Sequence, residues 1–236
     1  MPNWSVQLFG NRFDLEDLSK WFTTTDLQVV KESDGFYLKS DLFETIEEAE
    51  HVRTLAQEML QRLVGAAKLF RTNFMSVELG EVTRQEDDKQ RHRYVSLSAS
   101  IVVRSKTSSI LTVNGREETP PKVPLPAVWA AVAKDDKKVL QALRLWANNP
   151  DSWDNLYKIL EVIESDVGGA IYCNGWVSKT EVRRFTQTAN SAEALGDEAR
   201  HTKRHVPPPP RPMTIKEAIQ LMKALLQKWI ASKTPS

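Results

Sequence analysis

Five residues with cationic or titratable side chains lie within six positions, in the segment Arg200-His201-Thr202-Lys203-Arg204-His205. Histidine is the side chain whose unperturbed charge changes nearest to neutral pH, and the arginine guanidinium binds phosphate oxygens in a bidentate fork. Residues of these types at this spacing predict a site that binds phosphate or transfers protons. A solvated loop has the same composition, so a structural interpretation stays open beside the chemical one.

Arg200 and His205 are separated by four residues, and the polar His201 directly follows the arginine. This pattern resembles the Arg-x(4–6)-His motif of HEPN proteins, which are helical bundles that include many metal-independent ribonucleases of bacterial toxin and defence systems. The resemblance covers this hexapeptide and the helical pattern of the second half of the chain. It implies that Arg200 holds the scissile phosphate and that His205 transfers a proton, without a cofactor.

Further basic residues precede this segment. Lys179 and Arg183 are four positions apart, so they share one face of a predicted helix. Arg200 and Arg211 could extend this face into a local basic patch that binds RNA. The predicted substrate-binding residues are Arg183, Arg184, His201, Lys203 and Arg204. The alternative is an ordinary solvated face with scattered salt bridges.

A structural role for the Arg200 loop is an equal alternative to catalysis. Arg200 could be bound by a carboxylate of a neighbouring helix, and the candidates are Glu161, Glu164 and Asp166. The proline run at residues 207–210 favours polyproline II, either as a stiff strap into the last helix or as a ligand for an SH3-like domain. In this interpretation the chain is a non-catalytic protein-interaction module.

No metal site is predicted. His201 and His205 are four positions apart, but the sequence offers no obvious third ligand, and structural zinc takes four protein ligands. Cys173 is the single cysteine, so an intramolecular disulfide is excluded. The sequence contains no G-x-G-x-x-G, P-loop, G-x-S-x-G or H-E-x-x-H motif, which argues against the commonest nucleotide-binding and hydrolase classes.

The composition indicates a folded protein of nearly balanced charge. Seven tryptophans and a hydrophobic fraction of 41% suffice for a core, and the formal net charge is +1. RNA binding must therefore depend on a local patch rather than on the charge of the whole chain. The N-terminus lacks the pattern of a signal peptide, and no apolar run approaches the ~20 residues needed to span a bilayer. We expect a soluble cytoplasmic protein with no membrane partner.

The first half of the sequence alternates strand and helix patterns. Trp4, Val6 and Leu8 alternate as on a half-buried strand, and Asp34-Gly35 between two apolar runs predicts a hairpin. Thr45 and Glu48 form a capping-box pattern before a long helix. The other expected elements are a short helix capped by Asp14 and strands over residues 27–31, 36–39, 77–84, 93–104 and 110–113.

Prolines between residues 120 and 126 separate this half from a second half with helical periodicity throughout. Ser152, Ser178 and the Thr214–Glu217 box are predicted N-terminal caps, and Gly168-Gly169 is a predicted helix end. Helices are expected over residues 128–133, 137–146, 152–167, 179–189 and 214–232. We therefore predict an α+β protein. Residues 1–116 form a small, mostly antiparallel sheet with one long helix, and residues 117–236 form a helical bundle.

Overall fold

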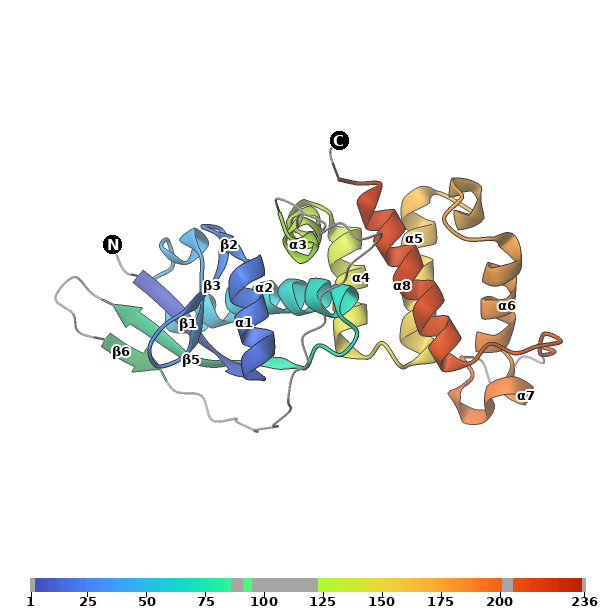
Figure 1. Cartoon of the computed structure of the whole chain (residues 1–236), viewed down its shortest axis with the longest axis horizontal. Coiled ribbons are helices and arrows are strands. Elements are labelled where there is room, and N and C mark those ends of the chain that lie inside the picture. Colours follow the sequence, from blue (N-terminus) through green and yellow to red (C-terminus); the bar gives the residue numbers. More distant parts are fainter. Residues whose placement is uncertain (1–2, 86–90, 95–122, 201–205, 235–236) are drawn as a thin grey trace, which may run out of the picture. The chain divides into compact units, whose positions relative to one another are not determined.

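The computed structural model describes residues 3–85, 91–94, 123–200 and 206–234 (Figure 1). The chain divides into two compact units, Met1–Val128 and Trp129–Ser236. The predicted boundary between residues 116 and 117, the predicted strand at residues 110–113 and most of the predicted strand at residues 93–104 lie outside the described residues. These three stay predictions.

The first unit is built on an antiparallel sheet, as predicted, and its described strands follow the order β2-β3-β4-β1-β5-β6. Every strand pair in it is antiparallel. The strands are β1 (Asn3–Gly10), β2 (Thr23–Thr24), β3 (Leu27–Lys31), β4 (Phe36–Lys39), β5 (Val77–Gln85) and β6 (Arg91–Tyr94). Trp4, Val6 and Leu8 are all buried, so the alternation of β1 does mark its core side.

The hairpin of β3 and β4 turns at Asp34-Gly35 as predicted, with Lys31 opposite Phe36.

Two helices connect the described strands. Helix α1 (Arg12–Trp21) joins β1 to the β2–β3 side of the sheet, and α2 (Ala49–Phe70) joins β4 to β5. Because β4 lies between β1 and β3, the order β1-α1-β3-β4-α2-β5 makes a split βαβ arrangement. Both helices contact the sheet.

The predicted capping box at the start of α2 is wrong. Glu48 is the N-cap residue, but it makes no side-chain capping bond, and the helix begins only at Ala49. Residues Asp41–Phe43 form a 3-10 turn instead, and the Thr45 hydroxyl donates to the carbonyl of Leu42 (3.4 Å). The carbonyl of Ile46 accepts the indole N–H of Trp4 (2.8 Å). This contact with β1 fixes the segment before α2 outside the helix.

Asp14 is likewise not the cap of α1. Asn11 caps this helix by accepting the N–H of Phe13 (3.0 Å). The Asp14 carboxylate is buried, forms an ion pair with Arg71 and accepts the N–H of Met75 (2.9 Å). Arg71 also pairs with Asp17, so one guanidinium joins α1 to the segment that follows α2.

The second unit is helical, as predicted. Its longer helices are α3 (Leu125–Asp135), which begins before the boundary, α4 (Lys137–Asn148), α5 (Trp153–Val167), α6 (Lys179–Ala189) and α8 (Ile215–Ala231), and its short helices are Ile171–Asn174, α7 (Ala192–Leu195) and Gly196–Glu198. The predicted caps Ser152, Ser178 and Thr214 accept backbone N–H groups, and Gly168 ends α5 with φ 70°. Helix α5 contacts α4, α6 and α8. The α+β class is therefore confirmed.

Contacts distant in sequence hold the ends of three helices together. Lys233, just after α8, lies 2.7 Å from both Asp136 and Asp166. Asp136 caps α4, and Asp166 also accepts the indole N–H of Trp229 (2.9 Å). The end of α8 is thus fixed to the start of α4 and the end of α5.

Within the described ranges, every helix is too short or too polar to span a bilayer.

Candidate functional site

Of the cluster that includes the predicted catalytic pair, the structure describes Arg200 only. His201, Lys203, Arg204 and His205 lie outside the described residues. The proximity of Arg200 to His205, on which the resemblance to HEPN proteins depends, therefore stays a prediction.

Arg200 is bound to helix α5. Its guanidinium donates to a carboxylate oxygen of Glu161 (2.7 Å) and stacks 4.0 Å from the ring centre of Tyr157, one helical turn earlier. Its backbone N–H donates to the carbonyl of Ala189 (2.9 Å), at the end of α6. The side chain is only 24% exposed. The predicted structural tie to a neighbouring carboxylate is confirmed, and its partner is Glu161.

Glu164, the second candidate partner, has a different environment. Burial and the nearby negative charge of Glu161 raise the pKa of Glu164. Glu161 lies on the more exposed side of the helix, with a side chain that is 45% exposed. The guanidinium is therefore paired with the more exposed of the two carboxylates.

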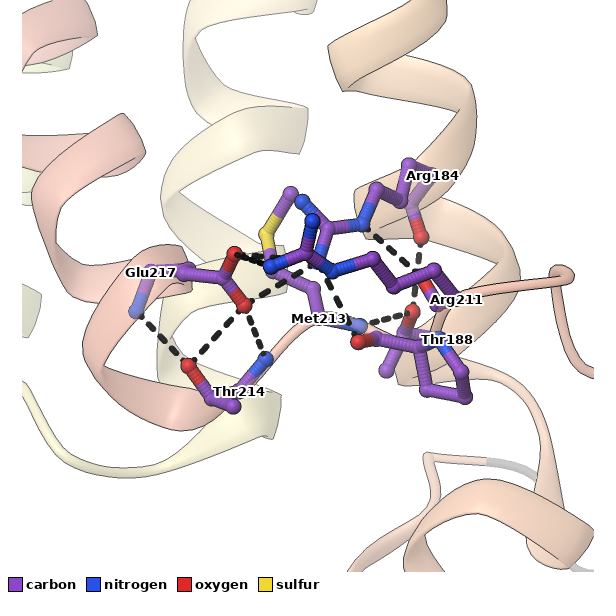
Figure 2. A network of polar contacts seen from close by, with 7 residues as sticks. Arg184, Thr188, Arg211, Met213, Thr214 and Glu217 are labelled. Carbon is purple, nitrogen blue, oxygen red and sulfur yellow. Dashed lines mark hydrogen bonds and ion pairs between the residues drawn. The ribbon is translucent and has the colours of Figure 1, made fainter.

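Arg184, predicted to bind substrate, is also bound inside the protein (Figure 2). Its Nε donates to the carbonyl of Arg211 (2.8 Å), and its Nη2 donates to the carbonyl of Pro212 (3.2 Å). The same Nη2 lies 3.0 Å from each carboxylate oxygen of Glu217 in α8. One side chain of α6 thereby holds both the proline-rich segment and the first turn of α8.

Thr188 completes this network one turn further along α6. Its hydroxyl donates to the carbonyl of Arg184 (2.8 Å) and accepts the N–H of Met213 (3.0 Å). Thr188 and Met213 are both buried, as is Pro209 in the same segment. The strap interpretation of the prolines agrees with these contacts, because α6 fixes the segment by its backbone.

Glu217, the carboxylate of this network, has a strongly lowered pKa. The N–H of Thr214, the guanidinium of Arg184 and the Thr214 hydroxyl all donate to it, and they lower its pKa from 4.5 to about 2. Thr214 and Glu217 form the predicted capping box. Glu217 is therefore ionised at any physiological pH.

The remaining predicted binding residue, Arg183, is exposed on α6. Lys179 on the same helix lies 5.6 Å from the ring centre of Tyr172, which is partly exposed. Two of the three described arginines of the predicted site are thus occupied by protein carboxylates, and one faces solvent.

A groove between α8 and the start of α6 was not predicted. It has a volume of about 700 Å³. Helix α8 contributes Glu217, Gln220, Leu221, Ala224 and Lys228 to it. The opposite side, from the loop before α6, from α6 itself and from the proline-rich segment, contributes chiefly Trp176, Val177, Glu181, Arg184 and Met213.

Polar contacts cross the groove at both ends. Arg184 and Glu217 close one end, and at the other Lys228 donates to the carbonyl of Trp176 (2.9 Å). Hydrogen bonds from the Ser178 hydroxyl and backbone N–H, together with the charge of Lys228, lower the pKa of Glu181. Each charged group at the groove therefore has a partner within it.

The sequence carries a faint signal of this groove. Gln220, Ala224 and Lys228 are exposed at four-residue spacing on α8, opposite its buried apolar side. The same spacing is typical of any solvated helix face, so it does not identify a groove by itself.

Among the described side chains, no group of three or more His, Cys, Asp or Glu could hold a metal ion. Comparisons with known protein families, with curated proteins and with solved structures find no match to this chain.

Proposed function

We propose that this chain is a non-catalytic protein-interaction module in which the Arg200 loop has a structural role. The observation that carries the proposal is the state of Arg200. Its guanidinium is bonded to Glu161 at 2.7 Å and stacked on Tyr157 at 4.0 Å. An arginine held in this way supports its own loop.

The competing proposal is a HEPN-like protein that binds or cleaves RNA. In that case Arg200 must exchange Glu161 for a phosphate, and Arg184 must exchange Glu217 and two backbone carbonyls. RNA binding draws its affinity from cations that neutralise phosphates and release counterions. Arginines already neutralised by protein carboxylates contribute little to such binding, which favours the interaction module.

The experiment compares Arg200→Ala, Arg200→Lys and His205→Ala in the full chain. We expect Arg200→Ala to lower the free energy of unfolding by about 1–2 kcal/mol, since it removes an ion pair and a cation–π contact. Arg200→Lys should recover part of this loss, because lysine keeps the charge but not the planar fork. His205→Ala should leave stability unchanged.

The same variants are incubated with a pool of single-stranded RNA oligonucleotides at several salt concentrations. We expect no cleavage and no salt-dependent binding by the unaltered chain. If the chain cleaves RNA, and well-folded Arg200→Ala and His205→Ala proteins each lose about 10²–10⁴-fold in rate, the ribonuclease proposal replaces ours.

A further inference from the structure

We infer that the groove between α6 and α8 binds a short, extended and uncharged peptide segment of a partner protein, with an apolar side chain seated at Ala224. This inference rests on the proposed interaction function and names its surface and its ligand.

The length of the groove suits a short peptide. Its two closing contacts involve Glu217 and Lys228 of α8, which are 11 positions apart. At a rise of about 1.5 Å per helical residue, the groove is roughly 16 Å long. An extended chain rises about 3.3 Å per residue, so about five residues fill this length.

The charges of the groove select an uncharged ligand. The lining contains two acidic side chains, Glu181 and Glu217, and two basic ones, Arg184 and Lys228, so their formal charges cancel. Arg184 is bonded to Glu217, Lys228 to the carbonyl of Trp176, and Glu181 to the hydroxyl and backbone N–H of Ser178. A nucleic acid needs a net positive surface, and an acidic or basic peptide gains most from a charged group that is not already bonded within the protein. The lining has no net charge, and all four of its charged side chains are bonded within the protein.

The middle of the groove offers apolar contact and a peptide-like hydrogen-bonding group. Ala224 has the smallest side chain of the α8 lining, and Leu221 lies beside it. One turn before Ala224, the exposed amide of Gln220 can both donate to and accept from a peptide backbone. A ligand residue makes both kinds of contact if its apolar side chain lies at Ala224 and its backbone is hydrogen-bonded to the Gln220 amide.

The test selects peptides from a displayed library of random heptapeptides on the full chain. Cys173 is the single cysteine, is exposed and lies two positions before Gly175 at the groove, so a fluorophore attached to it reports binding. The blocking variant is Ala224→Trp, which fills the middle of the groove. Its matched control is Ala131→Trp, at an exposed alanine of α3 outside the groove lining.

We expect the enriched peptides to carry an apolar residue between uncharged residues. Their synthetic forms should bind Ala224→Trp at least ten-fold more weakly and Ala131→Trp with unchanged affinity. Circular dichroism and melting curves check that both variants are folded, and Ala224→Gln replaces Ala224→Trp if the latter is not.

Three results would overturn the inference: no enrichment, enrichment of strongly charged peptides only, or equal binding to the Ala224 and Ala131 variants. Peptides that bind equally to both variants would rule out the groove as the binding site without contradicting the proposed interaction function. RNA cleavage that depends on Arg200 would contradict the proposed interaction function itself, so the two failures are distinguishable.

Discussion

The Thr188 hydroxyl of α6 accepts a hydrogen bond from the backbone N–H of the buried Met213 (3.0 Å). Thr188→Val keeps the shape of the side chain but leaves the Met213 N–H buried without a partner. We expect a loss of about 1–3 kcal/mol in the free energy of unfolding, measured by urea denaturation. Thr188→Ser is the control, because it keeps the hydroxyl and loses one methyl group, worth about 0.8 kcal/mol. Equal or greater loss in the serine variant would show that the hydroxyl is not the stabilising group.

Glu217 predicts how the stability of the helical unit changes in acid. The N–H of Thr214, Arg184 and the Thr214 hydroxyl lower the pKa of Glu217 to about 2 in the folded chain, against 4.5 ordinarily. The unfolded chain therefore takes up the proton first as the pH falls. The stability from these contacts is complete above pH 4.5 and is lost between pH 4.5 and about 2. Between pH 4.5 and about 2, the melting temperature should decrease less steeply with falling pH for Glu217→Gln than for the unaltered chain. An equal decrease in the two proteins would contradict the assignment.

At the scale of elements, Arg71 joins α1 to the segment after α2. Asp14, its buried partner, is only 6% exposed. Arg71→Ala leaves this carboxylate without its counter-ion, and we expect a loss of about 3–5 kcal/mol in the free energy of unfolding.

Arg12→Ala is the matched control for Arg71→Ala. Arg12 lies on α1, as Asp14 does, but is 76% exposed and pairs with Glu16, so its removal should change stability by less than about 1 kcal/mol. Similar losses in the two variants would mean that burial of Asp14 does not decide the effect.

The elements that could be predicted are those whose signals are local. The β3–β4 hairpin and the caps at Ser152, Ser178 and Thr214 depend on residues within a few positions. The start of α2 depends instead on the bond from Trp4 to Ile46, 42 positions apart, and the role of Asp14 depends on Arg71, 57 positions away. Capping patterns describe one helix end and carry no information about such partners.

Part of the candidate site could likewise be predicted from the sequence, and part of it could not. A tie from Arg200 to one of three carboxylates could be predicted, but the choice of Glu161 is made by the packing of its loop on α5. Arg184 looks like a solvent-facing cation in the sequence, because its carbonyl partners lie 27 and 28 positions later. The groove joins α8 to a loop about 50 positions earlier, and no local pattern describes that juxtaposition.

For the whole molecule, the division into two compact units predicts independent folding of the second. We expect a fragment of residues 123–236, which keeps all of α3, to show a helical circular dichroism spectrum and one cooperative melting transition. Thr188→Val should destabilise this fragment as much as it destabilises the full chain. A fragment without a cooperative transition would show that the second unit needs the first.

The reach of Lys233 back to Asp136 also has a consequence for synthesis of the chain on the ribosome. These residues are 97 positions apart, and Trp229 and Asp166 are 63 apart. At about 5–20 residues per second, the start of α4 emerges roughly 5–20 s before the lysine that neutralises its cap. Through this interval α5 lacks the apolar side of α8. The nascent helical unit therefore exposes a hydrophobic surface that chaperones can bind until its last helix has been translated.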